Sequence, residues 1–131
     1  MKTLKISTIL VLALIISSCA STKRFPVSTV TPAADISITR NHDKNGNAVI
    51  KVTAKNLASV DRLDPPQKAY VVWIVTEKDG VHNIGKLKNK NAKTTGLETL
   101  TSFKFTEVFI TAEEQADAVY PSGVEVSRIK F

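Results

Sequence analysis

Side chains able to do catalytic chemistry are few and scattered in this chain of 131 residues. The two histidines, His42 and His82, lie far apart, beside Asp43 and Asn83, in or near predicted turns. Their spacing fits neither the short intervals of a zinc site nor a nucleophile elbow serving a Ser-His-Asp arrangement. We therefore expect both histidines at the surface, and we predict no catalytic residue, no metal site and no cofactor.

Carboxylates cluster in the segment "TAEEQAD", which holds Glu113, Glu114 and Asp117. The paired carboxylates of glycosidases are defined by their separation in space, which sequence spacing does not give. The chain also lacks a glycine-rich phosphate loop. We interpret the acidic cluster as part of a solvated loop.

Lysines recur with a regular spacing in "GKLKNKNAK". Lys86, Lys88 and Lys90 alternate, so on a strand they would share one face, and Lys93 follows in a loop. Such a stripe could bind an anionic glycan or lipid headgroups. It could equally be a solvated face, or a charged edge that discourages pairing with other strands. We favour these two interpretations over a binding site.

Trp73 is the only tryptophan, and it lies within the apolar run "YVVWIV". It could be a platform on which a ligand stacks. However, a continuously apolar, β-branched and aromatic run is typical of a central strand covered on both faces. We therefore expect Trp73 in the core.

Cys19 is the only cysteine, and it ends a segment typical of export. Lys2 and Lys5 precede an apolar run over residues 6–16, which is shorter than the roughly 20 residues of a spanning helix. A basic start, a short apolar run and small residues before a cleavage point indicate a secretory signal peptide.

The stretch "ISSC" at residues 16–19 resembles the lipobox of bacterial lipoproteins. The resemblance implies that residues 1–18 are a lipoprotein signal peptide and that Cys19 receives lipid and anchors the chain to a membrane. The alternative is an ordinary signal peptide with Cys19 a bystander. Ala20, not aspartate, follows Cys19, which by resemblance to sorting patterns in diderm bacteria favours the outer membrane; the absence of an acidic cluster favours its periplasmic face.

Composition and length bound the mature part of the chain. Residues 19–34 are rich in Ser, Thr, Ala and Pro, which predicts a flexible tether after the lipidated cysteine, reaching about 50 Å when extended. Residues 35–131 are enough for one domain. Without Lys2 and Lys5, 16 of the 18 basic residues remain against 12 acidic ones, so the net charge of the mature part is +4, a mild excess, and we do not expect nucleic acid as a partner of an exported chain.

The sequence of residues 35–131 predicts an all-β domain. Alternating apolar residues at 36–38 and 50–54 flank Asn45-Gly46, which favours a hairpin. Residues 70–75 form a central strand, and further strands are expected in residues 81–88, 97–105, 107–114 and 124–131, the last with a bulge near Ser127. About seven short strands without a helix predict an immunoglobulin-like β-sandwich, with a small barrel as the alternative.

Four segments of the second half resemble the extracytoplasmic domain of anti-sigma-K factors: "YVVWIV" at 70, "IGKL" at 84, "VFITAEE" at 108 and "YPSGVEV" at 120. The positions that carry the resemblance, within residues 69–127, are Tyr70, Trp73, Gly85, Leu87, Ile110, Thr111, Glu113, Pro121 and Gly123. It implies a fold and an envelope location. Members of that family also carry a cytoplasmic sigma-binding domain and a transmembrane helix, which we do not find here, so sigma inhibition is not expected.

These inferences favour a non-catalytic, membrane-anchored envelope lipoprotein that acts as a binding or sensing module. We expect its partner to be an envelope protein or glycan, contacted first by the loops at residues 57–69 and 111–123 and second by the lysine stripe. The alternative is a structural or assembly lipoprotein that scaffolds an envelope complex. A small envelope hydrolase is disfavoured because no catalytic constellation is evident.

Overall fold

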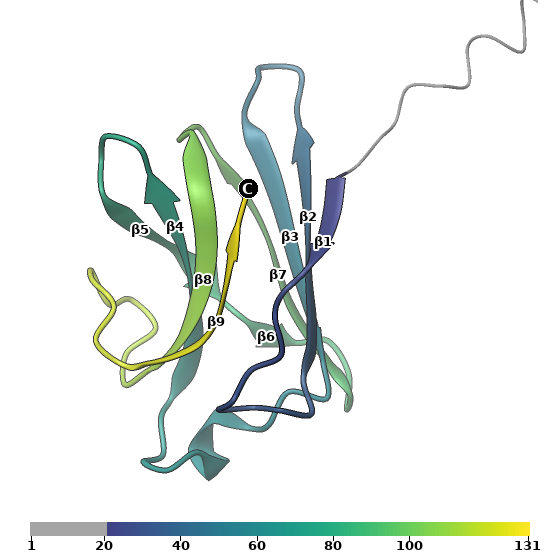
Figure 1. The fold of residues 1–131 in the computed structure, drawn as a ribbon, viewed down its shortest axis with the longest axis vertical. Helices are drawn as coiled ribbons and strands as arrows, with labels where there is room; N and C mark the ends of the chain where they lie inside the picture. Colours follow the sequence, from purple (N-terminus) through teal and green to yellow (C-terminus); the bar gives the residue numbers. More distant parts are fainter. Residues whose placement is uncertain (1–20) are drawn as a thin grey trace, which may run out of the picture.

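Two antiparallel sheets make up the fold of residues 21–131, the part of the chain that this computed structural model describes (Figure 1). The five-stranded sheet has the order β1 (Ser21–Arg24), β2 (Asp35–His42), β3 (Ala48–Lys55), β7 (Thr94–Thr101), β6 (Lys88–Asn89). The four-stranded sheet has the order β5 (Val81–Lys86), β4 (Ala69–Thr76), β8 (Phe105–Glu113), β9 (Val124–Lys130). The predicted all-β, sandwich-like architecture is confirmed, whereas the predicted signal peptide and Cys19 lie outside the described residues.

The hairpin of β2 and β3 forms where the sequence predicts it. Gly46 takes the positive φ of 79° that the turn requires. Asp43 closes the turn, because its Oδ1 accepts hydrogen bonds from the backbone N of Asn45 and of Asn47, at 2.9 and 2.8 Å.

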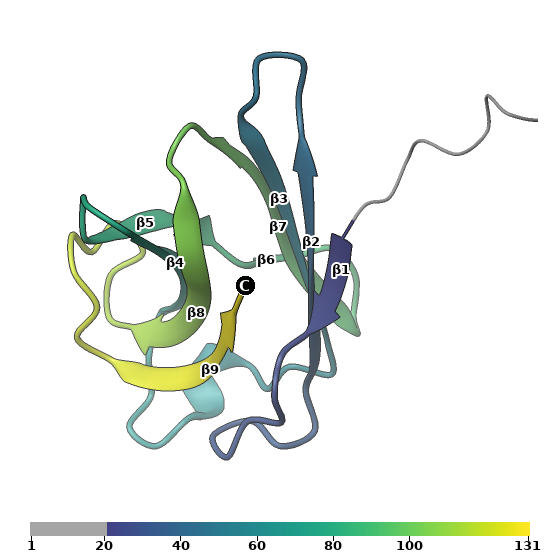
Figure 2. The same ribbon diagram turned by 45° about the horizontal axis from the view of Figure 1, so that its top comes forward.

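The core lies between the sheets, which form two layers in Figure 2. Ile38, Ile50 and Val52 fill it from one side, and Val72 and Ile110 from the other, all fully buried. Strand β4 is central in its sheet and is buried on both faces, as its continuous apolar run predicts.

The outer face of β4 carries a second apolar cluster. Trp73 is fully buried there and stacks on Phe109 of β8, with the ring centroids 6.2 Å apart. Ala116 and Ala118, from the loop between β8 and β9, pack over this cluster. The expectation that Trp73 belongs to the core is confirmed, with the β8–β9 loop supplying the cover on its outer side.

The predicted return strand over residues 81–88 is in fact two strands in different sheets. Strand β5 ends at Lys86, the chain crosses between the layers at the buried Leu87, and Lys88 begins β6. The backbone N of Leu87 donates to the carbonyl oxygen of Tyr70 at 2.9 Å. Therefore the alternating lysines do not share one face of one strand, and that prediction is wrong.

The tether predicted for residues 19–34 is wrong over its described part. Strand β1 pairs with β2 in a register that sets Ser21 opposite Arg40 and Arg24 opposite Ser37. Phe25 is buried, and the Ser28 hydroxyl accepts hydrogen bonds from the backbone N of Val30 and of Thr31. One apolar anchor and one hydroxyl-capped turn order a segment whose composition resembles a linker, so the folded domain extends from residue 21.

Two irregularities shape the four-stranded sheet. The register of β8 and β9 shifts between Ile110 and Thr111, which leaves Val126 without a partner and confirms the bulge predicted near Ser127. The register of β4 and β5 shifts at Ile84, beside Gly85, whose φ is 133°. A Cβ at Gly85 would lie 3.0 Å from the Leu97 side chain, so the two sheets approach closely at this edge.

The sandwich has two distinct ends. The hairpin end carries the β2–β3 turn, the β4–β5 turn, the loop at residues 102–104 and the C-terminus (Figure 1). The loop end carries residues 25–34, residues 56–68 with the 3₁₀ turn η1 (Val60–Arg62), residues 87–93 and residues 114–123. Among residues 21–131, no helix is long and apolar enough to cross a membrane.

Candidate functional site

A cleft of about 590 Å³ opens at the loop end of the sandwich. Residues 56–60 and 68–70 form one wall, and residues 86–89 and 91–95 form the other. The crossing of the chain at Leu87 creates the cleft, because it carries Lys86 and Lys88 from one sheet edge to the other. The first loop predicted as a contact surface and part of the lysine stripe therefore face the same space.

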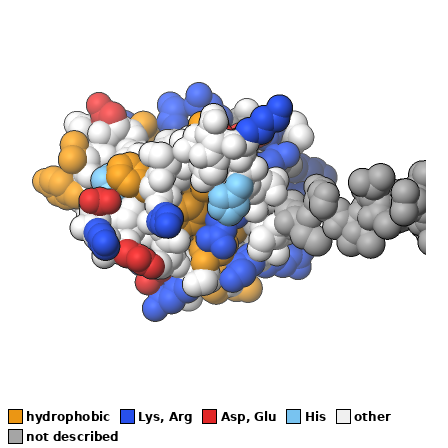
Figure 3. All heavy atoms as spheres, turned by 90° about the horizontal axis from the view of Figure 1, so that it is seen from above, with side chains coloured by type: hydrophobic (Ala, Val, Ile, Leu, Met, Phe, Trp, Pro, Cys, Tyr) orange, Lys and Arg blue, Asp and Glu red, His pale blue; other side chains and the backbone are white. Residues whose placement is uncertain are grey.

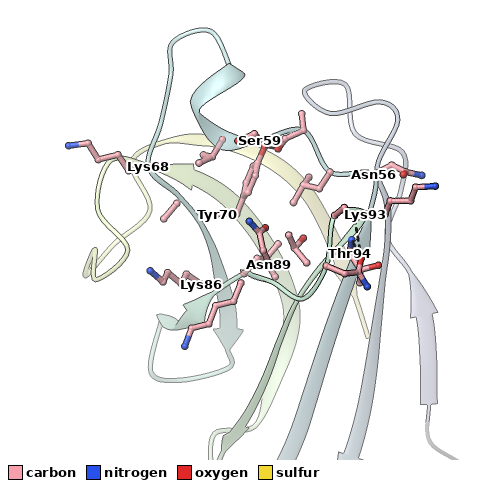
Figure 4. A pocket seen from close by; sticks show the side chains of 17 residues that line it. Asn56, Ser59, Lys68, Tyr70, Lys86, Asn89, Lys93 and Thr94 are labelled. Atoms are coloured by element: carbon pink, nitrogen blue, oxygen red, sulfur yellow. Dashed lines mark hydrogen bonds between the residues drawn. The ribbon is translucent and has the colours of Figure 1, made fainter.

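The rim of this cleft is basic. Lys68, Lys86, Lys88 and Lys93 line it, and no aspartate or glutamate does. Figure 4 shows Lys68 and Lys86 extending outward on one side and Lys93 on the other. Only Lys68 of these four has a salt bridge within residues 21–131, to Glu114 at 3.1 Å. A rim of this kind attracts anions. Lys90 is not part of it, since its side chain lies against Gly96.

The interior of the cleft is polar and ordered. Tyr70 and Asn89 point into it (Figure 4). The Tyr70 hydroxyl donates to the carbonyl oxygen of Ala58 at 2.6 Å, and burial, together with the nearby Asp61, raises the pKa of Tyr70 to about 12. This phenol therefore stays neutral and braces the wall of the cleft.

The opposite wall is fixed by an asparagine. The Asn91 Oδ1 accepts hydrogen bonds from the backbone N of Lys93 and of Thr94, both at 3.0 Å. The Lys93 carbonyl oxygen in turn accepts from the backbone N of Asn56 at 2.9 Å, which joins the two walls. The lysines thus project from a preorganised frame.

Glu113 is not the solvated loop residue that its sequence context predicts. Its side chain is 1% exposed, and its Oε1 accepts from the Thr111 hydroxyl at 2.6 Å and from the backbone N of Ser122 at 3.0 Å. Its Oε2 accepts from the Ser122 hydroxyl at 2.9 Å and from the backbone N of Gly123 at 3.0 Å. The carboxylate therefore closes the β8–β9 loop onto the end of β8.

The Glu113 network reaches the buried tryptophan. Trp73 Nε1 donates to the Thr111 Oγ1 at 2.8 Å, and Thr111 donates to Glu113. Burial alone would raise the pKa of Glu113, but the hydrogen bonds from Thr111, Gly123 and Ser122 outweigh it and hold the pKa below its ordinary value of 4.5. A carboxylate with this full set of partners has a structural role.

We expect Glu113→Gln to lower the free energy of unfolding by about 1–3 kcal/mol at pH 7, because an amide cannot accept all four hydrogen bonds. A carboxylate whose pKa is depressed in the folded state stabilises the fold above its unfolded pKa, and this contribution is lost as the pH falls through the folded value. Urea unfolding at pH 7 and at pH 3 should therefore show the two proteins converging in acid. A difference that is constant across this range would contradict the assignment.

The remainder of the β8–β9 loop is also pinned. Asn83 Nδ2 donates to the carbonyl oxygens of Ala116 and Ala118, both at 3.0 Å. Val119 and Tyr120 lie between the residues held by Asn83 and those held by Glu113, and their side chains are 83% and 73% exposed. A shallow hollow of about 420 Å³ lies within the loop. The second predicted contact loop is therefore a fixed protrusion with an apolar tip.

The surface predictions for the other acidic residues and for the histidines are confirmed except for His82. Glu114, Asp117 and His42 are exposed, as predicted. His82 is half-buried in β5, where its ring stacks on Phe103 at 4.3 Å and its buried Nε2 has no hydrogen-bond partner. The surface prediction for His82 is therefore wrong. Neither histidine lines the cleft, and within residues 21–131 no group of three His, Cys, Asp or Glu could hold a metal.

The positions singled out by the anti-sigma-K resemblance are mostly joined by backbone and hydrogen-bond contacts. Trp73, Thr111, Glu113 and Gly123 belong to one hydrogen-bonded chain. A Cβ at Gly123 would lie 1.7 Å from the Ala112 carbonyl oxygen, so only glycine fits there. These four residues build the scaffold, whereas Tyr70 and Leu87, which also carry the resemblance, line the cleft beside its lysines.

A row of charged side chains, Glu107, Glu125 and Arg128, lies across the outer face of the four-stranded sheet. The Arg128 guanidinium lies over the Phe109 ring at 4.0 Å and pairs with Glu107 and Glu125, at 2.6 and 2.8 Å. The hydrogen bond to Glu125 is the main cause that raises the pKa of Arg128. This row is satisfied internally, unlike Lys86, Lys88 and Lys93 at the cleft, which have no salt bridge within residues 21–131. Comparison of the chain with protein-family models, with curated proteins and with solved structures finds no match.

Proposed function

We propose that this protein is a non-catalytic, membrane-anchored envelope lipoprotein that acts as a binding or sensing module, with the lysine-rimmed cleft as its binding site. The anchor is lipid on Cys19, as the resemblance of "ISSC" to a lipobox implies. Ala20, in place of aspartate after Cys19, favours the outer membrane, and the absence of an acidic cluster favours its periplasmic face.

The observation that carries the proposal is the composition of the cleft. Its volume of about 590 Å³ lies within the range of ligand sites, and four lysines line it without a carboxylate. Asn56, Asn89 and Asn91 add amides that can donate to and accept from hydroxyl groups. Lysines with amides suit an acidic glycan of the envelope, which presents carboxylates and hydroxyls together.

The fold that we propose is immunoglobulin-like. Strands β2, β3, β7 and β6 follow the order A-B-E-D of that fold, and β5, β4, β8 and β9 follow the order C′-C-F-G. In such sandwiches, loops at the ends of the strands are the usual contact surfaces. The resemblance to the extracytoplasmic domain of anti-sigma-K factors supports the same scaffold and a sensing role, without the sigma-binding part.

The test is titration with soluble peptidoglycan fragments, which carry free carboxylates, followed by calorimetry. We expect Lys86→Glu combined with Lys93→Glu to weaken binding at least tenfold, a change of about 1.4 kcal/mol. The matched control reverses the charge of two lysines at the opposite end of the sandwich, Lys78→Glu with Lys104→Glu. This variant should bind like the wild type. Equal weakening in both variants, or no binding by the wild type, would refute an acidic glycan as the ligand.

The alternative function is a structural or assembly lipoprotein that scaffolds an envelope complex. The fixed protrusion with Val119 and Tyr120 at its tip favours it, because a large exposed apolar pair on a rigid loop fits a protein partner. A stoichiometric complex that dissociates with Val119→Ser and Tyr120→Ser, and tolerates the cleft substitutions, would favour the scaffold.

A further inference from the structure

Strand β1 fixes where a lipid on Cys19 would lie. Ser21 pairs with Arg40, so the chain enters the domain at the hairpin end. Only Ala20 separates Cys19 from this strand, and two residues span at most about 7 Å. The inference that follows rests on the lipid anchor of the proposed function. With that anchor, the hairpin end is held close to the bilayer.

The hairpin end has the side chains of a surface for anionic lipid. Lys44, Lys78 and Lys104 project from its three loops, and none has a salt bridge within residues 21–131. Figure 3 looks onto this end and shows more lysine and arginine than acidic side chains. Lys23, Arg40 and Lys130 lie at the same end, beside Phe131 and Phe105.

Apolar side chains lie among these cations. Phe103, in the loop beside Lys104, is 40% exposed, and Leu100 is 55% exposed. Phe103 is held in place, since it stacks on His82. Aromatic and aliphatic groups surrounded by lysines are the composition with which peripheral proteins insert into the headgroup region.

Acidic and titratable groups at this end are few. Asp43 is engaged by Asn45 and Asn47 of its own turn, and Glu107 pairs with Lys130 at 3.8 Å. Within residues 21–131 this leaves Glu77 and Asp79 of the β4–β5 turn as the exposed carboxylates without a salt bridge at this end. The six cations therefore outnumber the acidic groups, and a negatively charged bilayer face attracts such an end.

We propose that the hairpin end is a membrane-contact surface, which docks on anionic phospholipid headgroups and turns the cleft away from the bilayer. The eight-residue strands between the two ends, β2 and β3 among them, set the cleft about 26 Å from the membrane. The short connection at Ala20 keeps the hairpin end near the bilayer, and the docking of its cations on the headgroups sets the direction in which the cleft faces.

The single cysteine makes the test direct, because acylation of Cys19 leaves any introduced cysteine as the only free thiol. An environment-sensitive fluorophore is attached at Asn45→Cys or Ser102→Cys, at the hairpin end, and at Ala92→Cys, at the cleft, as the matched control. All three positions are exposed. The lipidated protein is reconstituted in vesicles of phosphatidylethanolamine and phosphatidylglycerol that contain a headgroup-bound quencher.

We expect strong quenching at Asn45→Cys and Ser102→Cys and almost none at Ala92→Cys. Replacing phosphatidylglycerol with phosphatidylcholine, or adding Lys44→Glu, Lys78→Glu and Lys104→Glu, should remove most of the difference. Equal quenching at all three labels would overturn the membrane-contact surface alone. A difference in quenching that does not depend on lipid charge would do the same. Absence of palmitate label on the wild type would instead overturn the anchor of the proposed function, and this inference with it.

Discussion

Trp73→Ala should lower the free energy of unfolding by about 3–5 kcal/mol, a large share of the stability of a domain of this size. Trp73 is fully buried on the outer face of β4, where it stacks on Phe109. It also lies in a row of directly paired residues across the sheet, Asn83, Trp73, Phe109 and Arg128. Removing the indole opens a cavity under the β8–β9 loop and leaves the Thr111 hydroxyl without its donor.

Urea unfolding followed by far-ultraviolet circular dichroism measures this loss, since the variant has no tryptophan fluorescence. The control is Trp73→Phe, which keeps an aromatic ring against Phe109 but loses the hydrogen bond to Thr111, and should cost about 1–2 kcal/mol. A loss below about 1 kcal/mol for Trp73→Ala would show that the outer cluster contributes little to stability.

Gly123→Ala should be at least as damaging, with a loss of more than about 4 kcal/mol or failure to fold. The added Cβ would meet the carbonyl oxygen of Ala112 at 1.7 Å, and that atom is backbone in a paired strand. Relief would require β9 to separate from β8 at Val124, which also breaks the hydrogen bond from the backbone N of Gly123 to Glu113.

The matched control for Gly123 is Gly80→Ala in the β4–β5 turn. Gly80 has a positive φ of 77° but nothing within 4 Å of an added Cβ, so its cost is backbone strain of about 1–2 kcal/mol. Thermal unfolding of both variants separates steric overlap from strain. Similar stability for the two would contradict the close approach at Gly123.

Several apolar strands and the β2–β3 hairpin could be predicted from sequence because burial leaves a pattern. Strand β4 is covered on both faces, and its run from Tyr70 to Val75 is continuously apolar. The β2–β3 hairpin alternates, and Asn45-Gly46 fixes its turn. The phase change in β9 predicts the bulge near Ser127. In each case the local residues carry the information.

Strand β1 could not be predicted, because its four residues are all exposed and it joins the sheet through backbone hydrogen bonds. No alternation marks such an edge strand, and only Phe25 beyond it signals attachment. The role of Glu113 was hidden for another reason: its partners at Ser122 and Gly123 are brought to it by the β8–β9 pairing. The cleft was hidden because a change of sheet at Leu87 has no pattern of its own.

Three of the four edge strands of the sandwich have features that bear on crowding. Strand β6 has two residues, β1 exposes Lys23 and Arg24, and the bulge at Ile84 interrupts β5 beside Gly85. Short, charged or bulged edges resist pairing with a second copy. Molecules confined to a membrane plane meet one another side by side and at high local density, the condition in which open strand edges polymerise. On the membrane to which the proposed anchor would confine the domain, the irregular register at Ile84 would therefore also keep neighbouring copies separate.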